Sequence, residues 1–334
     1  MTDRIRATLR AIAARAHLEP APAPPTQVHI SVTDRCNFAC RHCAIHRKRT
    51  RDLPTADWLA FIDAVGDWLG GGGINFAGGE PLLRRDLEQL ISRAVARGFA
   101  TTFNTNGWDM GPERAASIVA SGVSIVYVSL DGATAATVDW TRGRPGAFDR
   151  AHAAIDALQA AGCPQIIVAA ILHGRNAAEI PALLEFVRAR GLQLVIQPLY
   201  QTFDEPHDPC WYQRSELWPQ DLATTEAALD LLADTRRAWG PVCNATAQIE
   251  GIRRYFRDPG THNGLACRAG HTDLAVDPQG NLRLCFMLDP IGHVGPHPEL
   301  AWVGPRALHR RWQVSRCGRP CNLLNCNFEG IGGQ

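Results

Sequence analysis

Three cysteines lie close together in the segment Cys36-Asn-Phe-Ala-Cys40-Arg-His-Cys43, directly after a short apolar run. A structural zinc site uses four protein ligands, whereas three thiolates on an iron–sulfur cluster leave one iron open to another ligand. The segment therefore predicts a metal centre with an open coordination position. The alternative is a closed zinc site in which His42 or His46 supplies the fourth ligand.

A second group of cysteines occupies the last quarter of the chain: Cys267, Cys285, Cys317, Cys321 and Cys326. Residues 273–276 and 282–285, joined by Pro278-Gln279-Gly280, predict a β-hairpin with Cys267 before it and Cys285 at its end. Cysteines placed on a hairpin in this way suit an auxiliary iron–sulfur cluster or a zinc ribbon. Cys163, Cys210 and Cys243 stand apart, and Cys163 is interpreted as a small buried apolar residue.

The 334 residues include 11 cysteines, an odd number, and 46% of the residues are hydrophobic. A chain of this length buries a core without disulfides, so its clustered cysteines are interpreted as metal ligands in a reducing compartment. The formal net charge of +1 argues against a nucleic-acid partner, and no apolar run is long enough to span a membrane. We therefore expect a cytoplasmic protein with neither nucleic acid nor membrane as a partner.

Residues 1–26 are expected to form an N-terminal helix followed by a proline-rich connector. The segment is rich in arginine and alanine but lacks the apolar core of an export signal. A mitochondrial transit peptide is the alternative, against which Asp3 and Glu19 argue.

The elements that must position the first cysteines alternate between strand and helix along the chain. Strands are predicted at residues 28–32, 74–76, 101–104, 125–130, 166–171 and 194–197, and helices at 55–69, 85–97, 112–120, 148–161 and 179–190. This order predicts an α/β fold with a parallel sheet, either a partial barrel or an open doubly wound sheet. In both, functional residues gather at the carboxyl ends of the strands.

The ordered motifs of residues 27–200 resemble those of the radical S-adenosylmethionine (SAM) superfamily. Cys-x3-Cys-x2-Cys follows the first strand, and Gly78-Gly79-Glu80-Pro81 ends the second. The other matching segments are Thr105-Asn106-Gly107, Ser129-Leu130-Asp131-Gly132, Arg142-Gly143, Gly146-Ala147-Phe148, and Asn176 with Glu179. The resemblance implies a partial (β/α)6 TIM-type barrel over residues 27–200, closed by a connector and a helix in residues 201–260.

The resemblance also implies the cofactors and the residues that bind them. Cys36, Cys40 and Cys43 would hold a [4Fe–4S] cluster whose open iron takes SAM, which yields a 5′-deoxyadenosyl radical after one-electron reduction. The residues implied to contact SAM are Gly78, Gly79, Glu80, Asn106, Ser129, Asp131 and His42. His42 departs from the family, which more often has a larger aromatic residue before the third cysteine. A reducing partner such as flavodoxin or ferredoxin would supply the electron.

Residues 261–334 resemble the extensions called SPASM and twitch, which hold auxiliary iron–sulfur clusters. Cys267, Gly280 and Cys285 match the opening C-x9–15-G-x4-C of those extensions. A full SPASM extension has more cysteines than the five present here, so the resemblance implies a twitch-type module with one auxiliary [4Fe–4S] cluster. Four of the five would be ligands: Cys267, Cys285 and two of Cys317, Cys321 and Cys326.

The expected reaction is hydrogen abstraction from a small polar metabolite, such as a sugar, aminocyclitol or nucleoside, in natural-product biosynthesis. Its outcome would be dehydrogenation, epimerisation or decarboxylation, and Cys210 and Cys243 are candidate hydrogen donors in an epimerisation. The alternatives are a maturase of ribosomally made peptides and a non-catalytic cluster-bearing protein. The intact Gly79, Glu80 and Ser129 argue against the latter, because a scaffold needs no SAM site.

Overall fold

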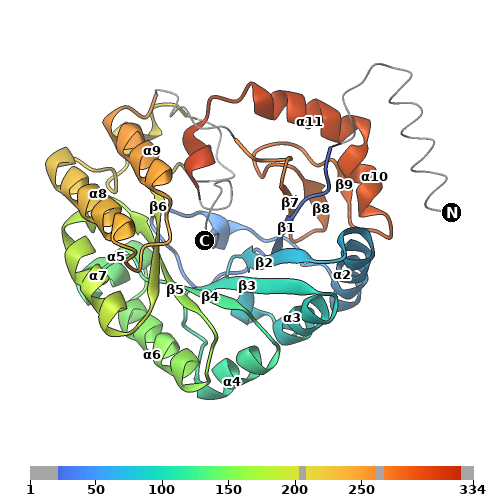
Figure 1. Ribbon diagram of the computed structural model, residues 1–334, viewed down its shortest axis with the longest axis horizontal. Coiled ribbons are helices and arrows are strands. Elements are labelled where there is room, and N and C mark those ends of the chain that lie inside the picture. Colours follow the sequence, from blue (N-terminus) through green and yellow to red (C-terminus); the bar gives the residue numbers. More distant parts are fainter. Residues whose placement is uncertain (1–21, 203–207, 261–266, 325–334) are drawn as a thin grey trace.

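Six parallel strands form the larger part of one sheet, in the order β6-β5-β4-β3-β2-β1. The computed structural model describes residues 22–202, 208–260 and 267–324. The strands are β1 (Gln27–Thr33), β2 (Gly72–Gly78), β3 (Phe99–Thr105), β4 (Ile125–Ser129), β5 (Ile166–Leu172) and β6 (Gln193–Pro198). The predicted strands and the partial barrel are thus confirmed, and helices cover the outer face of the sheet (Figure 1).

The helices between these strands pack an apolar stripe against the sheet. They are α2 (Thr55–Leu69), α3 (Leu87–Ala96), α4 (Pro112–Ala120), α6 (Ala147–Ala160) and α7 (Ile180–Ala189). In α2, Trp58, Phe61, Ile62 and Val65 are almost fully buried, which is the spacing of one helix face. These five helices agree with the sequence prediction to within two residues at each end.

One helix of the barrel, α5 (Ala135–Arg142), was not predicted. The Thr134 side chain caps it by accepting from the Thr137 N–H, and Gly143 ends it in the left-handed conformation. Val138 is the one aliphatic residue on its buried face, where the others are Thr137, Thr141 and Arg142, so hydrophobic periodicity gives little signal for it.

The predicted hairpin is part of the barrel sheet. The strands β7 (Asp273–Val276), β8 (Asn281–Arg283) and β9 (Gly292–His293) extend the sheet beyond β1. β7 runs parallel to β1, with Gln27 opposite Asp273, and His29 Nε2 lies 3.0 Å from Asp273 Oδ1. The boundary predicted near residue 260 therefore falls between strands of one continuous sheet, as Figure 1 shows.

Four further helices surround the two ends of this sheet. α8 (Leu222–Arg237) and α9 (Thr246–Arg257) pack together, and α10 (Pro298–Val303) and α11 (Pro305–Ser315) follow the hairpin. The sequence predicted a single helix in residues 201–260, where the structure has both α8 and α9. Trp302 of α10 is buried and donates from Nε1 to the Ala23 carbonyl at 3.0 Å. The helix expected in residues 1–26 and the ligand candidate Cys326 fall mainly or wholly outside the described residues.

Short 3-10 helices shape the loops at the carboxyl ends of the strands and in the tail. They are η1 (Ile45–Arg47), η2 (Pro81–Leu83), η3 (Ala177–Glu179), η4 (Trp211–Arg214) and η5 (Pro320–Leu323). Within the part of the chain that the structure describes, no helix is long and apolar enough to cross a bilayer.

Candidate active site

The loop that carries Cys36, Cys40 and Cys43 leaves the carboxyl end of β1 and is held on two sides by glycines. A Cβ on Gly79 would lie 2.1 Å from the Arg35 carbonyl oxygen, and one on Gly143 would lie 2.2 Å from that of Ala39. Glycine is therefore needed at both positions for the backbones to approach this closely. The three thiols are half-buried, and none of them is in a disulfide.

Burial and a neighbouring positive charge have opposite effects on the pKa of these cysteine thiols. Burial raises the pKa of Cys36 and raises that of Cys40 to about 12, while the Arg142 guanidinium lowers both. The thiols also interact electrostatically with one another. Because iron is bound by thiolates, metal binding here releases protons that burial would otherwise retain.

These donors fit an iron–sulfur cluster with an open position. They are three thiols on one loop, close enough to influence one another and next to a buried cation that favours the thiolate. Among the described residues, no three His, Cys, Asp or Glu side chains converge as they would around a single metal ion.

Glu80 lies beneath this loop and is 1% exposed. Its carboxylate accepts from the Thr105 hydroxyl at 2.8 Å, the Leu82 N–H at 3.1 Å and the Asn106 N–H at 2.7 Å. Burial raises its pKa to about 7, although these hydrogen bonds lower it. Glu80 thus joins the end of β2 to the end of β3, and its oxygens already have partners within the protein.

The remaining residues expected to contact SAM divide into accessible and buried groups. Ser129 is partly exposed at the end of β4. Asn106 is buried and donates to the Asn37 side chain of the cysteine loop at 2.7 Å. The Asp131 side chain is fully buried and paired with Arg142, with 2.6 Å between Oδ2 and Nε. His42 is half-buried, and its buried Nδ1 has no hydrogen-bond partner among the described residues.

Four of the five C-terminal cysteines are described, and three of them lie near one another. Electrostatic coupling links Cys267 to Cys285 and Cys317, and it also links Cys285 to Cys317. Cys321 is buried in η5 and interacts with Tyr200 and Tyr255, raising the pKa of both phenols further than burial alone.

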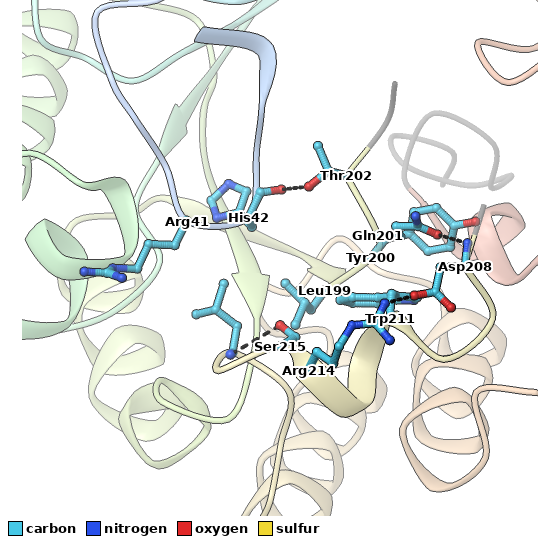
Figure 2. Close-up of a pocket in the computed structure, with 11 residues that line it drawn as sticks. Arg41, His42, Leu199, Tyr200, Gln201, Thr202, Asp208, Trp211, Arg214 and Ser215 are labelled. Carbon is cyan, nitrogen blue, oxygen red and sulfur yellow. Dashed lines mark hydrogen bonds and ion pairs between the residues drawn. The ribbon is translucent and has the colours of Figure 1, made fainter. Parts of the chain in front are cut away.

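A pocket of about 360 Å³ opens between the first cysteine loop and the segment that follows β6 (Figure 2). The residues that line it are Arg41, His42, Leu199, Tyr200, Gln201, Thr202, Asp208, Trp211, Arg214, Ser215 and Leu217. The Thr202 hydroxyl donates to the His42 carbonyl at 3.4 Å, which ties the two sides together. Tyr200 also approaches Cys317 and Cys321, so the pocket extends from one cysteine group toward the other.

The isolated cysteines have different positions. Cys210 is exposed at the start of η4, whose Trp211 and Arg214 line the pocket. Cys243 packs on Ile167 and Val195, and its thiol donates to Gln193 Oε1 at the amino end of β6. Because the first cysteine loop lies at the opposite ends of the strands, this position gives no support to Cys243 as a hydrogen donor.

Sequence reasoning assigned no role to several residues of this site. Arg142 was noted only within a motif, and Tyr200, Trp211 and Arg214 were placed in a connector. No local pattern marks the three connector residues, because the fold alone brings them to the cysteine loop. The one sequence feature that hints at a binding role is the high content of aromatic and charged residues in 200–219.

The comparisons with known proteins agree with this geometry. The model of the Radical SAM superfamily matches residues 30–187. The GTP 3′,8-cyclase of Agrobacterium fabrum is 31% identical over 253 residues, covering 71% of this chain and 69% of that protein. The chain therefore belongs to the radical SAM superfamily and is an iron–sulfur-dependent enzyme that uses SAM.

Further relatives include SPASM-domain enzymes. The mycofactocin maturase MftC of Mycolicibacterium smegmatis is 28% identical over 76% of this chain, which spans only 62% of that protein. The PqqA peptide cyclase of Ruegeria pomeroyi is 28% identical, and the match covers 92% of this chain and 82% of the cyclase.

Solved structures share the fold at low sequence identity. Streptococcus suis SuiB bound to its precursor peptide SuiA has a TM-score of 0.69 at 14% identity, covering 92% of this chain and 70% of SuiB. BtrN in complex with AdoMet and 2-DOIA has a TM-score of 0.50 at 16% identity. The match covers 93% of this chain and 96% of BtrN.

Proposed function

We propose that this enzyme abstracts hydrogen from a small polar metabolite, such as a sugar, aminocyclitol or nucleoside, bound in the pocket between the two cysteine groups. The product would be dehydrogenated, epimerised or decarboxylated. The observation that carries the proposal is the pocket itself, which has Arg41 and His42 from the first cysteine loop on one side and Tyr200 on the other.

Cys36, Cys40 and Cys43 would hold the [4Fe–4S] cluster, which when bound to SAM supplies one-electron reduction and a hydrogen-abstracting radical. The backbone around Gly78 and Gly79 would receive the amino group of SAM, because glycine permits close approach to the backbone. Glu80 would hold the Asn106 loop in place, and Ser129 and His42 remain the candidates for contact with the rest of SAM. Asp131 would contribute through Arg142, because its carboxylate is buried in that ion pair.

The second cysteine group would hold one auxiliary [4Fe–4S] cluster. Cys267, Cys285 and Cys317 support this because they lie near one another, and Cys321 or Cys326 would supply the fourth thiolate. An auxiliary cluster beside Tyr200 would be placed to accept an electron from a substrate radical, which favours dehydrogenation.

The lining of the pocket suits a small polar ligand. Its two arginines are paired with carboxylates: Arg41 with Glu216 at 2.7 Å and Arg214 with Asp208. Gln201, Thr202 and Ser215 offer neutral hydrogen-bonding groups, while Trp211 and Tyr200 offer aromatic faces. Neutralised charge, hydroxyl and amide groups, and flat apolar faces are what a hydroxylated ring would contact.

A peptide maturase is the second candidate. The PqqA peptide cyclase aligns over 92% of this chain, and the SuiB structure includes a bound peptide.

A substrate panel separates the two candidates. Enzyme reconstituted anaerobically and reduced with dithionite or flavodoxin is given SAM alone, SAM with aminocyclitols, sugars or nucleosides, or SAM with synthetic peptides. We expect the small polar compounds to raise 5′-deoxyadenosine release above the SAM-only rate. Trp211→Ala should raise KM about tenfold, equivalent to about 1.4 kcal/mol, while Trp312→Ala on exposed α11 should leave it unchanged. Stimulation by peptides alone would support the maturase instead.

Iron content tests the auxiliary cluster. Two [4Fe–4S] clusters correspond to about eight irons per chain. We expect the variant Cys267→Ala/Cys285→Ala to hold about four and still release 5′-deoxyadenosine from SAM. Cys163→Ala, which removes an isolated thiol, should keep about eight. A wild-type protein that reconstitutes with only about four irons would contradict the auxiliary cluster.

A further inference from the structure

A buried ion pair lies at the carboxyl ends of β4 and α5. Arg142 is 8% exposed and Asp131 is 0% exposed. Arg142 Nε lies 2.6 Å from Asp131 Oδ2, and Arg142 Nη2 donates to Oδ1 at 2.8 Å. A pair this deeply buried costs desolvation energy, so its net contribution to stability is small.

The backbone places Arg142 directly against Cys40. The residue before it, Thr141, accepts from the Arg41 N–H at 2.9 Å. The residue after it, Gly143, would bring a Cβ within 2.2 Å of the Ala39 carbonyl oxygen. Arg142 is therefore flanked by the two residues that contact the neighbours of Cys40, and its guanidinium interacts electrostatically with the Cys40 thiol.

Asp131 keeps the guanidinium in this position. Its Oδ1 also accepts from the Ile171 N–H at 2.9 Å, and its carbonyl accepts from the Asn176 side chain. Asn176 in turn donates to the Ile171 carbonyl at 2.8 Å. The carboxylate is thus fixed to β5, and the arginine that it holds has little freedom to turn away from Cys40.

We propose that Arg142 is a positioning residue that raises the reduction potential of the cluster held by Cys36, Cys40 and Cys43. With the cluster bound, its guanidinium would donate a hydrogen bond to the Cys40 sulfur and place positive charge beside it. Reduction by one external electron makes the cluster more negative, so both interactions stabilise the reduced state more than the oxidised state. Asp131 orients the guanidinium, and the inference depends on the family assignment rather than on the proposed substrate.

The test is an EPR-monitored redox titration of reconstituted protein without SAM. Arg142→Met should shift the one-electron equilibrium at least about tenfold toward the oxidised cluster, equivalent to about 59 mV. Arg142→Lys should shift it less, because the charge remains.

Arg144→Met is the matched control, since Arg144 is two residues away and donates to the Asn37 carbonyl rather than to a cysteine. Its potential should stay close to that of the wild type. Iron content and far-UV circular dichroism of each variant are measured alongside.

An unchanged potential in Arg142→Met with full iron content would overturn the proposal, as would an equal shift in Arg144→Met. If Arg142→Met does not retain iron, Asp131→Asn/Arg142→Gln replaces the ion pair with neutral groups of similar shape. A wild-type potential in that double variant would also overturn the proposal, and a lowered potential would support it.

Discussion

At the scale of single residues, burial near the cysteine loop keeps histidine neutral. His173 is 0% exposed, and burial lowers its pKa to about 4, despite the opposing effect of Asp131. Its Nδ1 accepts from the Arg175 N–H at 3.2 Å, and its Nε2 lies 3.3 Å from the Thr141 hydroxyl. Nδ1 must therefore stay unprotonated for the first of these hydrogen bonds to form.

This histidine should make stability fall as the pH falls. An unfolded histidine titrates near pH 6.5. Between about pH 6.5 and pH 4, His173 is therefore protonated in the unfolded chain but neutral in the folded protein. At pH 5 its contribution to the loss of unfolding free energy should be about 2 kcal/mol relative to pH 7. His173→Gln should reduce this pH dependence in urea unfolding of the iron-free protein.

His309→Gln, on the exposed face of α11, is the control and should keep the wild-type slope of stability against pH. If His173→Gln and His309→Gln show the same slope as the wild type, His173 is not the titrating group.

The residues that the sequence identified are those whose function needs only a local pattern. Cys36, Cys40 and Cys43 sit on one loop, and Gly79 and Glu80 end the next strand, so spacing alone marks them. Arg142 and Tyr200 act on cysteines about a hundred or more positions away, and no neighbouring residue reveals those contacts. Their roles become visible only when the strands are side by side.

At the scale of elements, the ends of β1 and β2 are fitted together without space for a side chain. The Gly79 N–H donates to the Thr33 carbonyl at 2.7 Å, and its Cα faces the Arg35 carbonyl. Gly79 does not adopt a positive φ, so the requirement for glycine here is one of space.

Gly79→Ala should therefore displace the cysteine loop. A Cβ 2.1 Å from the Arg35 carbonyl oxygen forces the backbone to move. We expect the iron retained after reconstitution and desalting to fall by more than about half, in keeping with the geometric demands of metal sites. Gly111→Ala is the control, because no atom lies within 4 Å of its Cβ and its φ is negative. Equal iron in both variants would show that the loop adapts to the added methyl group.

Elements with a regular apolar pattern were predicted well, and those without one were not. All six barrel strands and five of their helices follow from periodicity, because their buried positions are aliphatic or aromatic. α5 and α11 were not predicted, because polar residues and arginines dominate their surfaces and their positions depend on tertiary contacts. The pairing of β7 with β1 joins residues far apart in sequence, which no local signal encodes.

At the scale of the whole molecule, the C-terminal hairpin and the barrel share one sheet. Val28 and Ile30 of β1 and Leu274 of β7 are completely buried at this seam. The seam should therefore couple the stability of the last quarter of the chain to that of the strand that leads into the first cysteine loop.

Leu274→Ala should loosen both sides of the seam. Truncation of a fully buried leucine costs about 2–5 kcal/mol. Hydrogen exchange followed by mass spectrometry should then accelerate in residues 27–33 as well as in residues 273–276. Leu308→Ala, at a position 47% exposed on α11, should leave both segments protected. Faster exchange confined to the hairpin would mean that the two parts are energetically independent.

The parallel pairing of Gln27 with Asp273 also has a consequence for the order of folding. During translation β1 emerges first, and β2 to β6 can join the sheet on one side as they leave the ribosome. The other edge of β1 has no strand partner until the last quarter of the chain arrives, which makes the closing contact one of very high sequence separation. An unpaired edge beside the cysteine loop favours aggregation, so chaperone binding would protect the nascent chain until the last quarter is made.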